Sequence, residues 1–107
     1  MQLGTAKRGK WQVVYPVGRV DGHTAPELES VLQETIDAGE LWLAIHLGEV
    51  TYLSSAGLRA LLDTLKRLRS REGDICLIGP RDNVREVLDI TGFSELFSVV
   101  EQESAMP

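Results

Sequence analysis

The feature that most constrains the fold of this chain is the alternation of short apolar runs with longer helical patterns. The runs at 41–47 ("LWLAIHL") and 75–79 ("ICLIG") are almost continuously hydrophobic, which is typical of strands buried on both faces of a sheet. A helical pattern follows each run. This alternation predicts an α/β fold, with a mixed, mostly parallel β-sheet and helices packed against it.

The first helical segment lies within residues 21–39. Its apolar residues recur at helical spacing and form one face, made of Leu28, Val31, Leu32 and Ile36. Thr24 with Glu27 three residues later is typical of a capping box, and Pro26 is compatible with a first helical turn. Gly39 suits the left-handed position that ends a helix.

Two further helices are predicted. The second spans 57–71, and its inward face consists of Leu58, Leu61, Leu62, Leu65 and Leu68. Gly73 is expected to close the turn after it. The third is expected to be capped by Asp82 and stopped by Gly92, with an inward face of Val84, Val87, Leu88 and Ile90.

The remaining strands complete a predicted order of β-β-α-β-α-β-α-β. Residues 11–20 are rich in β-branched and aromatic side chains, and Pro16 among them predicts an edge position or a bulge. Residues 2–8 are expected to pair with this strand, and residues 97–101 form the last one. The sheet would then have four to five strands in a single domain over 1–107, with a frayed tail from about residue 101.

Net charge, cysteine content and the lack of long apolar runs limit the possible partners and the expected compartment. The formal net charge is -5, and an acidic domain repels nucleic-acid phosphates and anionic membranes. The single cysteine, Cys76, excludes an internal disulfide and is expected to be a buried, inert thiol. The start "MQLGTAKRGK" lacks the apolar core of a signal peptide, and no run is long enough to span a membrane. We therefore expect a cytoplasmic protein without direct contact to nucleic acid or membrane.

The stretch "TYLSSAGLRALL" at 51–62 joins an apolar run to the second helix through two serines and two very small residues. In one interpretation, Ser54 or Ser55 caps the helix and nothing more. In the other, a serine here accepts a phosphate, because the first turn of a helix offers free N–H groups and the positive end of its dipole. A phosphate would then change the surface without unfolding the domain. The residues alone leave both interpretations open.

Three segments together resemble the STAS domain family, specifically the small anti-sigma-factor antagonists of bacteria. The segment "VGRVDGHTAPELE" resembles that family's entry to the first helix, and "VTYLSSAGLRALL" its D-S-x-G-L phosphorylation motif. The segment "DNVREVLDITGFSELFSV" resembles its C-terminal block. The resemblance implies a STAS fold and a partner-switching protein that is not an enzyme, with no catalytic residue, cofactor or metal.

The resemblance also implies how the switch would work. The unphosphorylated protein would bind a serine-kinase anti-sigma factor with a histidine-kinase-like ATPase fold, which then releases its client. Phosphorylation by that kinase would abolish binding, and a PP2C-type phosphatase would reset it. Matching Gly57 and Leu58 to the motif's G-L places Ser55 at the phosphoacceptor position. Ser54, where many members have aspartate, is a secondary candidate, and Ala56 stands where many have serine or threonine.

The expected partner-binding residues are Asp21, Ser54, Ser55, Ala56, Gly57 and Arg59. Asp21 matches the family's aspartate after the second strand, and it is an equally plausible turn residue. Arg59 lies in the first turn of a helix, where the dipole disfavours a cation, and four residues after Ser55; we expect it to contact the partner or the phosphoserine. The alternative function is a non-switching STAS scaffold or a ligand-sensing module.

The sequence gives little support for an enzymatic function. "YLSSAG" is not a G-x-S-x-G elbow, and His46 is expected to be a hydrogen-bonded residue at a strand end. His23, His46 and Cys76 are widely separated, which makes a poor set of metal ligands. "LIGPRDN" has no Walker lysine.

Overall fold

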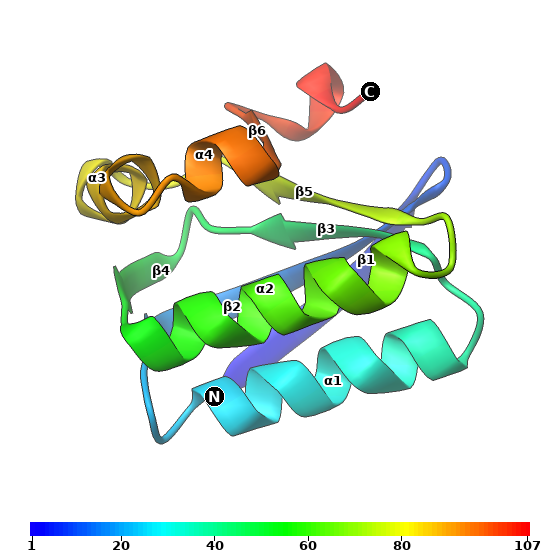
Figure 1. The fold of residues 1–107 in the computed structure, drawn as a ribbon, viewed down its shortest axis with the longest axis horizontal. Helices are drawn as coiled ribbons and strands as arrows, with labels where there is room; N and C mark the ends of the chain where they lie inside the picture. Colours follow the sequence, from blue (N-terminus) through cyan, green and yellow to red (C-terminus); the bar gives the residue numbers. More distant parts are fainter.

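Six strands form one sheet in the order β1-β2-β3-β5-β6, with β4 beside β2 (Figure 1). The computed structural model describes residues 1–107. The first pair is antiparallel and every other pair is parallel, so the predicted mostly parallel α/β sheet is confirmed. The strands are β1 (Gln2–Arg8), β2 (Trp11–Val20), β3 (Trp42–His46), β4 (Val50–Leu53), β5 (Asp74–Ile78) and β6 (Ser98–Val100).

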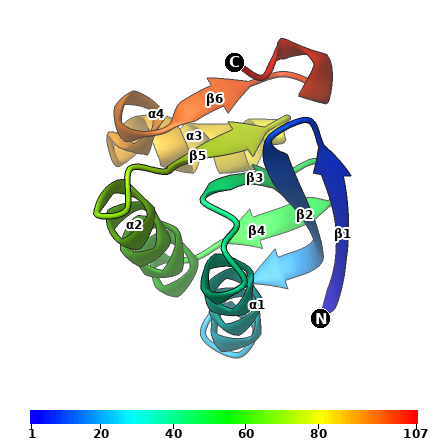
Figure 2. The ribbon, with the colours of Figure 1, turned by 90° about the vertical axis from the view of Figure 1, so that its right-hand side faces the viewer.

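Two long helices, α1 (Ala25–Asp37) and α2 (Ser55–Arg69), lie side by side on one face of the sheet (Figures 1 and 2). Helix α3 (Asp82–Ile90) packs against β4, and the one-turn helix α4 (Phe93–Leu96) leads into β6. A short 3-10 helix, η1 (Glu103–Ala105), follows near the C-terminus.

The main core fills the space between the sheet and the two long helices. The predicted helical faces supply it, with Leu28, Leu32 and Ile36 from α1 and Leu61, Leu65 and Leu68 from α2. Burying each such side chain stabilises the fold by about 1.5–3 kcal/mol. The third helix contributes Val84 and Leu88 as predicted. Ile90 was expected to point inward as well, but it is exposed, because it lies at the last position of α3.

Strand β4 and helix α4 were not anticipated. Each has four residues, too few to show a period of their own. Pro16 does not lie on an edge strand, since β2 has neighbours on both sides. It falls in the gap where β2 stops pairing with β3, after residue 14, and begins pairing with β4, at residue 18. A residue without an N–H is tolerated there because the ladder is interrupted.

The predicted N-terminal caps of α1 and α3 are wrong in detail. Thr24 occupies the N-cap position of α1, but its side chain makes no capping bond. Its hydroxyl instead donates to the carbonyl of Arg19 and accepts from the N–H of Asp21, which ties the loop to the end of β2. Asp82 lies inside α3, and Arg81 holds the cap position. Gly39 does end α1 with a left-handed φ of 98°.

The opposite face of the sheet carries a second, smaller apolar cluster, made of Trp11, Val13, Ala44, Cys76 and Ile78. Residues 101–107, which we term the C-terminal strap, lie on this side of the sheet, away from α1 and α2 (Figure 1).

Apolar packing and polar contacts together attach the strap. Met106 packs against the cluster, and Trp11 donates its indole N–H to the carbonyl of Pro107 at 3.0 Å. The Glu103 carboxylate accepts from the Tyr15 hydroxyl at 2.7 Å and from Arg8 Nε at 3.2 Å. The sequence predicts fraying for this segment, whereas the structure places it in contact with the sheet.

Deleting the strap is expected to lower the free energy of unfolding by about 2–4 kcal/mol, because Met106 leaves the apolar cluster and Trp11 loses its hydrogen-bond partner. Urea denaturation of the full and shortened chains measures the difference. Cys76 gives a second signal, since its burial in the same cluster protects the thiol, and deletion should accelerate its reaction with a thiol reagent.

A matched substitution separates the strap's polar attachment from its apolar one. Tyr15→Phe removes only the hydroxyl that donates to Glu103 and should cost about 1 kcal/mol. Equal urea midpoints for the full and shortened chains would show that the strap contributes nothing to the fold.

Candidate functional site

The start of α2 is held in place by Ser54. Its backbone is extended, with φ −87° and ψ 174°, and its Oγ accepts a hydrogen bond from the N–H of Gly57 at 3.3 Å. The N–H of Ser54 donates to the carbonyl of Val20 at 2.9 Å, which joins this residue to the end of β2. Of the two serines that the sequence offers as caps, Ser54 is therefore the one that caps the helix.

Ser55 is the first residue of α2, and its side chain is exposed. Its hydroxyl is not used as the cap, because Ser54 fills that role. The first turn of the helix presents free N–H groups and the positive end of the dipole beside it. An anion attached to Ser55 would be favoured electrostatically at this position.

Gly57 permits the close approach of α2 to the sheet. A Cβ at this position would lie 2.6 Å from Leu53 Cδ1 and 2.8 Å from Val20 Cγ1, which is closer than real contacts allow. Gly57 is buried, whereas Ala56 beside it is half-buried. Gly57 thus has a packing role, and its predicted contact with a partner stays a prediction.

Asp21 lies in the loop between β2 and α1 and organises that loop. Its Oδ1 accepts from the backbone N–H of His23 at 3.0 Å and of Thr24 at 3.3 Å, and its Oδ2 lies 3.4 Å from Arg19 Nε. The His23 N–H is the main reason that the pKa of this carboxyl is lowered from its ordinary value. The interpretation of Asp21 as a turn residue is confirmed, and its contact with a partner stays a prediction.

The fold brings Asp21 close to the start of α2. Val20, the residue before Asp21, accepts the N–H of Ser54 and lies within contact distance of the Gly57 position. The predicted partner-binding residues therefore share one end of the molecule, although two separate segments supply them.

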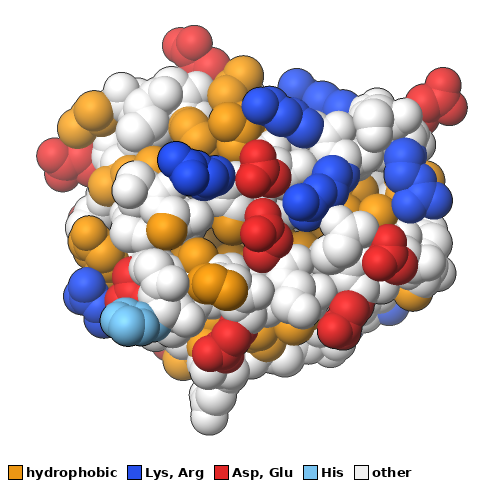
Figure 3. Space-filling model, turned by 60° about the horizontal axis from the view of Figure 1, so that its bottom comes forward, with side chains coloured by type: hydrophobic (Ala, Val, Ile, Leu, Met, Phe, Trp, Pro, Cys, Tyr) orange, Lys and Arg blue, Asp and Glu red, His pale blue; other side chains and the backbone are white.

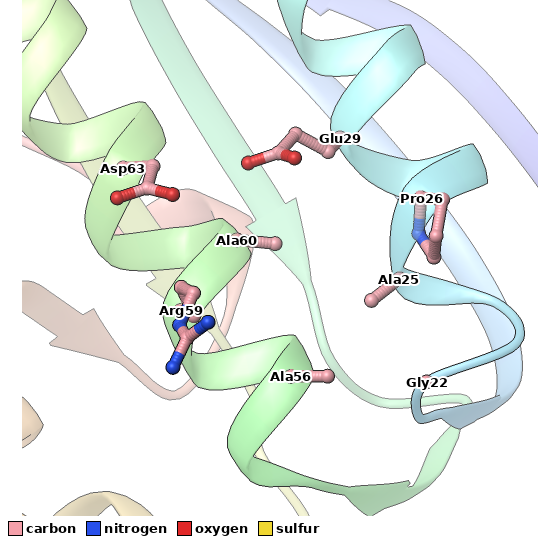
Figure 4. Close-up of a pocket in the computed structure, with 8 residues that line it drawn as sticks. All are labelled: Gly22, Ala25, Pro26, Glu29, Ala56, Arg59, Ala60 and Asp63. Carbon is pink, nitrogen blue, oxygen red and sulfur yellow. The ribbon is translucent and has the colours of Figure 1, made fainter.

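A shallow groove of about 170 Å³ continues from this end between α1 and α2. Figure 4 shows its lining, in which Ala25, Ala56 and Ala60 project between the two helices. Glu29 lies on one side, and Arg59 and Asp63 lie on the other. Acidic and basic side chains both occur on this face of the molecule (Figure 3), so it carries no field of a single sign.

Arg59 is exposed and takes part in no ion pair. It stands one helical turn after Ser55, where side chains four residues apart are neighbours. Its guanidinium is thus available to a phosphate on Ser55 or to a partner.

Other titratable residues have structural roles. His46 Nδ1 accepts from the N–H of Gly48 at 3.2 Å, which confirms the prediction of a hydrogen-bonded histidine at a strand end. Cys76 is buried, as predicted, and burial raises the pKa of its thiol to about 11. No group of three or more histidine, cysteine or acidic side chains is arranged to hold a metal ion. No helix has both the length and the hydropathy needed to cross a bilayer.

Two neighbours of the site, Arg19 and Tyr52, were not predicted from the sequence. The Arg19 guanidinium lies over the Tyr52 ring, 4.3 Å from its centroid, and the two residues are register partners on β2 and β4. Their pairing could not be predicted from the sequence, because it depends on β4 and β4 itself was not predicted.

Known proteins are similar to this chain over most of its length. A family model for the STAS domain matches residues 4–105. The chain is similar to BtrV of Bordetella bronchiseptica, with 39% identity over 88 residues, which are 82% of this chain and 76% of that protein. It is also similar to the anti-sigma-B factor antagonist of Staphylococcus aureus, with 31% identity over 101 residues, 94% of each chain.

Solved structures show the same fold. The anti-sigma factor antagonist SpoIIAA in its unphosphorylated form has a TM-score of 0.82 and 18% identity, covering 97% of this chain and 92% of that one. The Bacillus cell fate determinant SpoIIAA in the phosphorylated form has a TM-score of 0.75 and 17% identity, covering 97% and 96%.

Proposed function

Because this chain belongs to the STAS domain family, we propose that it is an anti-sigma-factor antagonist whose binding is controlled by phosphorylation of Ser55. Its curated relative from Staphylococcus aureus is an anti-sigma-B factor antagonist and aligns over nearly the whole of both chains. The unphosphorylated chain binds an anti-sigma factor that is itself a serine kinase, and this binding releases the kinase's client. The chain acts by binding rather than by catalysis.

One observation carries the choice of residue. Ser54 Oγ is engaged with the N–H of Gly57, whereas Ser55 is exposed at the first position of the helix. A kinase can reach Ser55 Oγ without breaking the cap. The γ-phosphoryl group of ATP is transferred to this oxygen, the hydroxyl proton is released, and ADP leaves. Modifying Ser54 would instead disrupt the cap, which is worth about 1 kcal/mol.

The phosphate acts on the surface rather than on the fold. It adds up to about two negative charges and three acceptor oxygens beside the free N–H groups of α2, where the helix dipole favours an anion. Arg59, one turn later and without an ion pair, is placed to neutralise part of this charge. A partner packed against half-buried Ala56 is expelled by the added bulk and charge. A PP2C-type phosphatase hydrolyses the phosphoserine and restores the hydroxyl.

Incubation with the cognate kinase and ATP, followed by mass-spectrometric mapping, tests this proposal. We expect one phosphate on Ser55 of the wild-type chain and of Ser54→Ala, and no labelling of Ser55→Ala. Ser54→Ala serves as the matched control, because it removes a neighbouring hydroxyl and leaves the acceptor intact. Tight kinase binding without a phosphate on either serine would contradict the switch and would favour a non-switching scaffold.

A further inference from the structure

The outer face of the sheet is covered unevenly. The C-terminal strap lies over the apolar cluster that includes Trp11, Val13 and Ala44, beside the first half of β2. Towards the carboxyl end of β2, two large apolar side chains stay open to solvent: Val17 is 40% exposed and Tyr52 is 41% exposed. Val14 and Val20 of β2 both belong to the main core, although the register with β4 shifts between Gly18 and Arg19. Val17 and Arg19, at odd spacings from them, therefore lie on the opposite face with Trp11 and Val13.

Arg19 and Tyr52 form an ordered pair on this open part. They are register partners, and the guanidinium lies over the aromatic ring at 4.3 Å from its centroid. Arg19 Nε also faces Asp21 Oδ2 at 3.4 Å. Two side chains that are already held in place lose little conformational freedom when a partner covers them. We call Val17, Arg19 and Tyr52 the sheet-end patch.

The sheet-end patch adjoins, along the chain, both segments that carry the predicted partner-binding residues. Tyr52 is three residues before Ser55 along the chain, and Arg19 is bonded to Asp21 at the other predicted contact segment. Tyrosine and arginine are also the residue types that most often dominate the binding energy of interfaces. The terminal amino groups of Arg19 make no hydrogen bond within the chain, so they are free to bind a carboxylate.

We propose that the sheet-end patch is a second part of the docking surface for the anti-sigma-factor kinase, which meets it with an apolar side chain and a carboxylate. This inference rests on the proposed function. The two parts of the surface have different roles. The phosphate blocks binding at the Ser55 part. The sheet-end patch lies on the sheet face and contributes affinity whether or not Ser55 is phosphorylated.

Affinities of the kinase for purified variants, measured by calorimetry, test the patch. Tyr52→Ala is expected to weaken binding by about tenfold or more, and Arg19→Glu, which repels the partner's carboxylate, by at least as much. Tyr52→Phe keeps the ring beneath the guanidinium and should bind within about twofold of the wild type. Ile90→Ala is the matched control, because it truncates the most exposed large apolar side chain of the chain, on α3, outside the patch. Thermal unfolding of each variant confirms that it is folded.

The outcomes separate this inference from the function on which it rests. If the kinase binds the wild type and phosphorylates Ser55, but binds folded Tyr52→Ala and Arg19→Glu with unchanged affinity, the patch is overturned and the switch stands. An equal loss in Ile90→Ala would also overturn it, because the effect would then not be specific to the patch. If the kinase fails to bind the wild type, the proposed function is wrong and the patch with it.

Discussion

Replacing Ser55 with glutamate is expected to weaken binding of the kinase by about a hundredfold or more, whereas Ser55→Ala should stay within about threefold of the wild type. The glutamate places a fixed negative charge where, in the proposed complex, the partner packs against the exposed start of α2. Covering a charge without a counter-charge costs several kcal/mol, and each 1.4 kcal/mol is a factor of ten in affinity. Alanine removes only a hydroxyl that makes no bond in the cap.

The matched control for this charge is Ser70→Glu. Ser70 is exposed at the opposite end of α2, so the same substitution changes the net charge equally but lies one helix length from the switch. We expect its affinity for the kinase to match that of the wild type. Surface plasmon resonance with the immobilised kinase compares the variants, and equal weakening by both glutamates would indicate a general charge effect instead of a switch at Ser55.

The two serines should also differ in their effect on stability, but here Ser54 rather than Ser55 is the sensitive position. Because Ser54 Oγ accepts the Gly57 N–H and Ser55 has no part in the cap, only loss of the Ser54 hydroxyl removes a bond from the fold. The sequence alone could not make this distinction, since both hydroxyls lie within one residue of the helix start. The choice depends on the extended backbone of Ser54 and on its bond to Val20 at the end of β2, and both are products of tertiary structure.

The order of buried strands and amphipathic helices was predictable because each long element carries its own period. Leu28, Val31, Leu32 and Ile36 recur at spacings of three and four, which places them on one face of a helix but on both faces of a strand. The structure buries Leu28, Leu32 and Ile36. Thr24 shows where such reasoning fails. Its spacing to Glu27 fits a capping box, but the hydroxyl found nearer partners in the Arg19 carbonyl and the Asp21 N–H. A sequence pattern cannot show whether a side chain will make the expected capping bond or a competing hydrogen bond that the folded structure offers.

The candidate site was only half predictable for the same reason. Asp21 and Ser55 stand in segments with recognisable patterns, and their proximity follows from the parallel sheet, in which β2 lies beside β4. Tyr52 was missed because "VTYL" is too short to be recognised as a strand. Without β4 there is no register, and without a register the contact between Tyr52 and Arg19 cannot be anticipated.

The turn after α2 shows how a correctly identified glycine can have a different reason from the expected one. The sequence predicts that Gly73 closes this turn, but the left-handed residue is Glu72, with φ 64°. The N–H of Glu72 bonds to the Arg69 carbonyl and the N–H of Gly73 to the Leu68 carbonyl, which is the pair of bonds of a Schellman motif. Gly73 is needed instead for a close approach, since a Cβ there would lie 2.1 Å from the Leu41 carbonyl oxygen.

Gly73→Ala is therefore expected to lower the free energy of unfolding by about 3 kcal/mol and the melting temperature by on the order of 15 °C. The Leu41 carbonyl cannot move aside cheaply, because it accepts the N–H of Asp74 at 3.0 Å where β5 begins to pair with β3. Gly22→Ala is the matched control, as a Cβ at Gly22 would meet nothing within 4 Å. Glu72→Gly should have the opposite sign and stabilise the chain by about 0.5–1 kcal/mol, because glycine adopts the left-handed conformation without strain. Calorimetric melting temperatures of the three variants test this prediction. If Gly73→Ala melts at the same temperature as Gly22→Ala, the close approach of Leu41 to this turn does not constrain the fold.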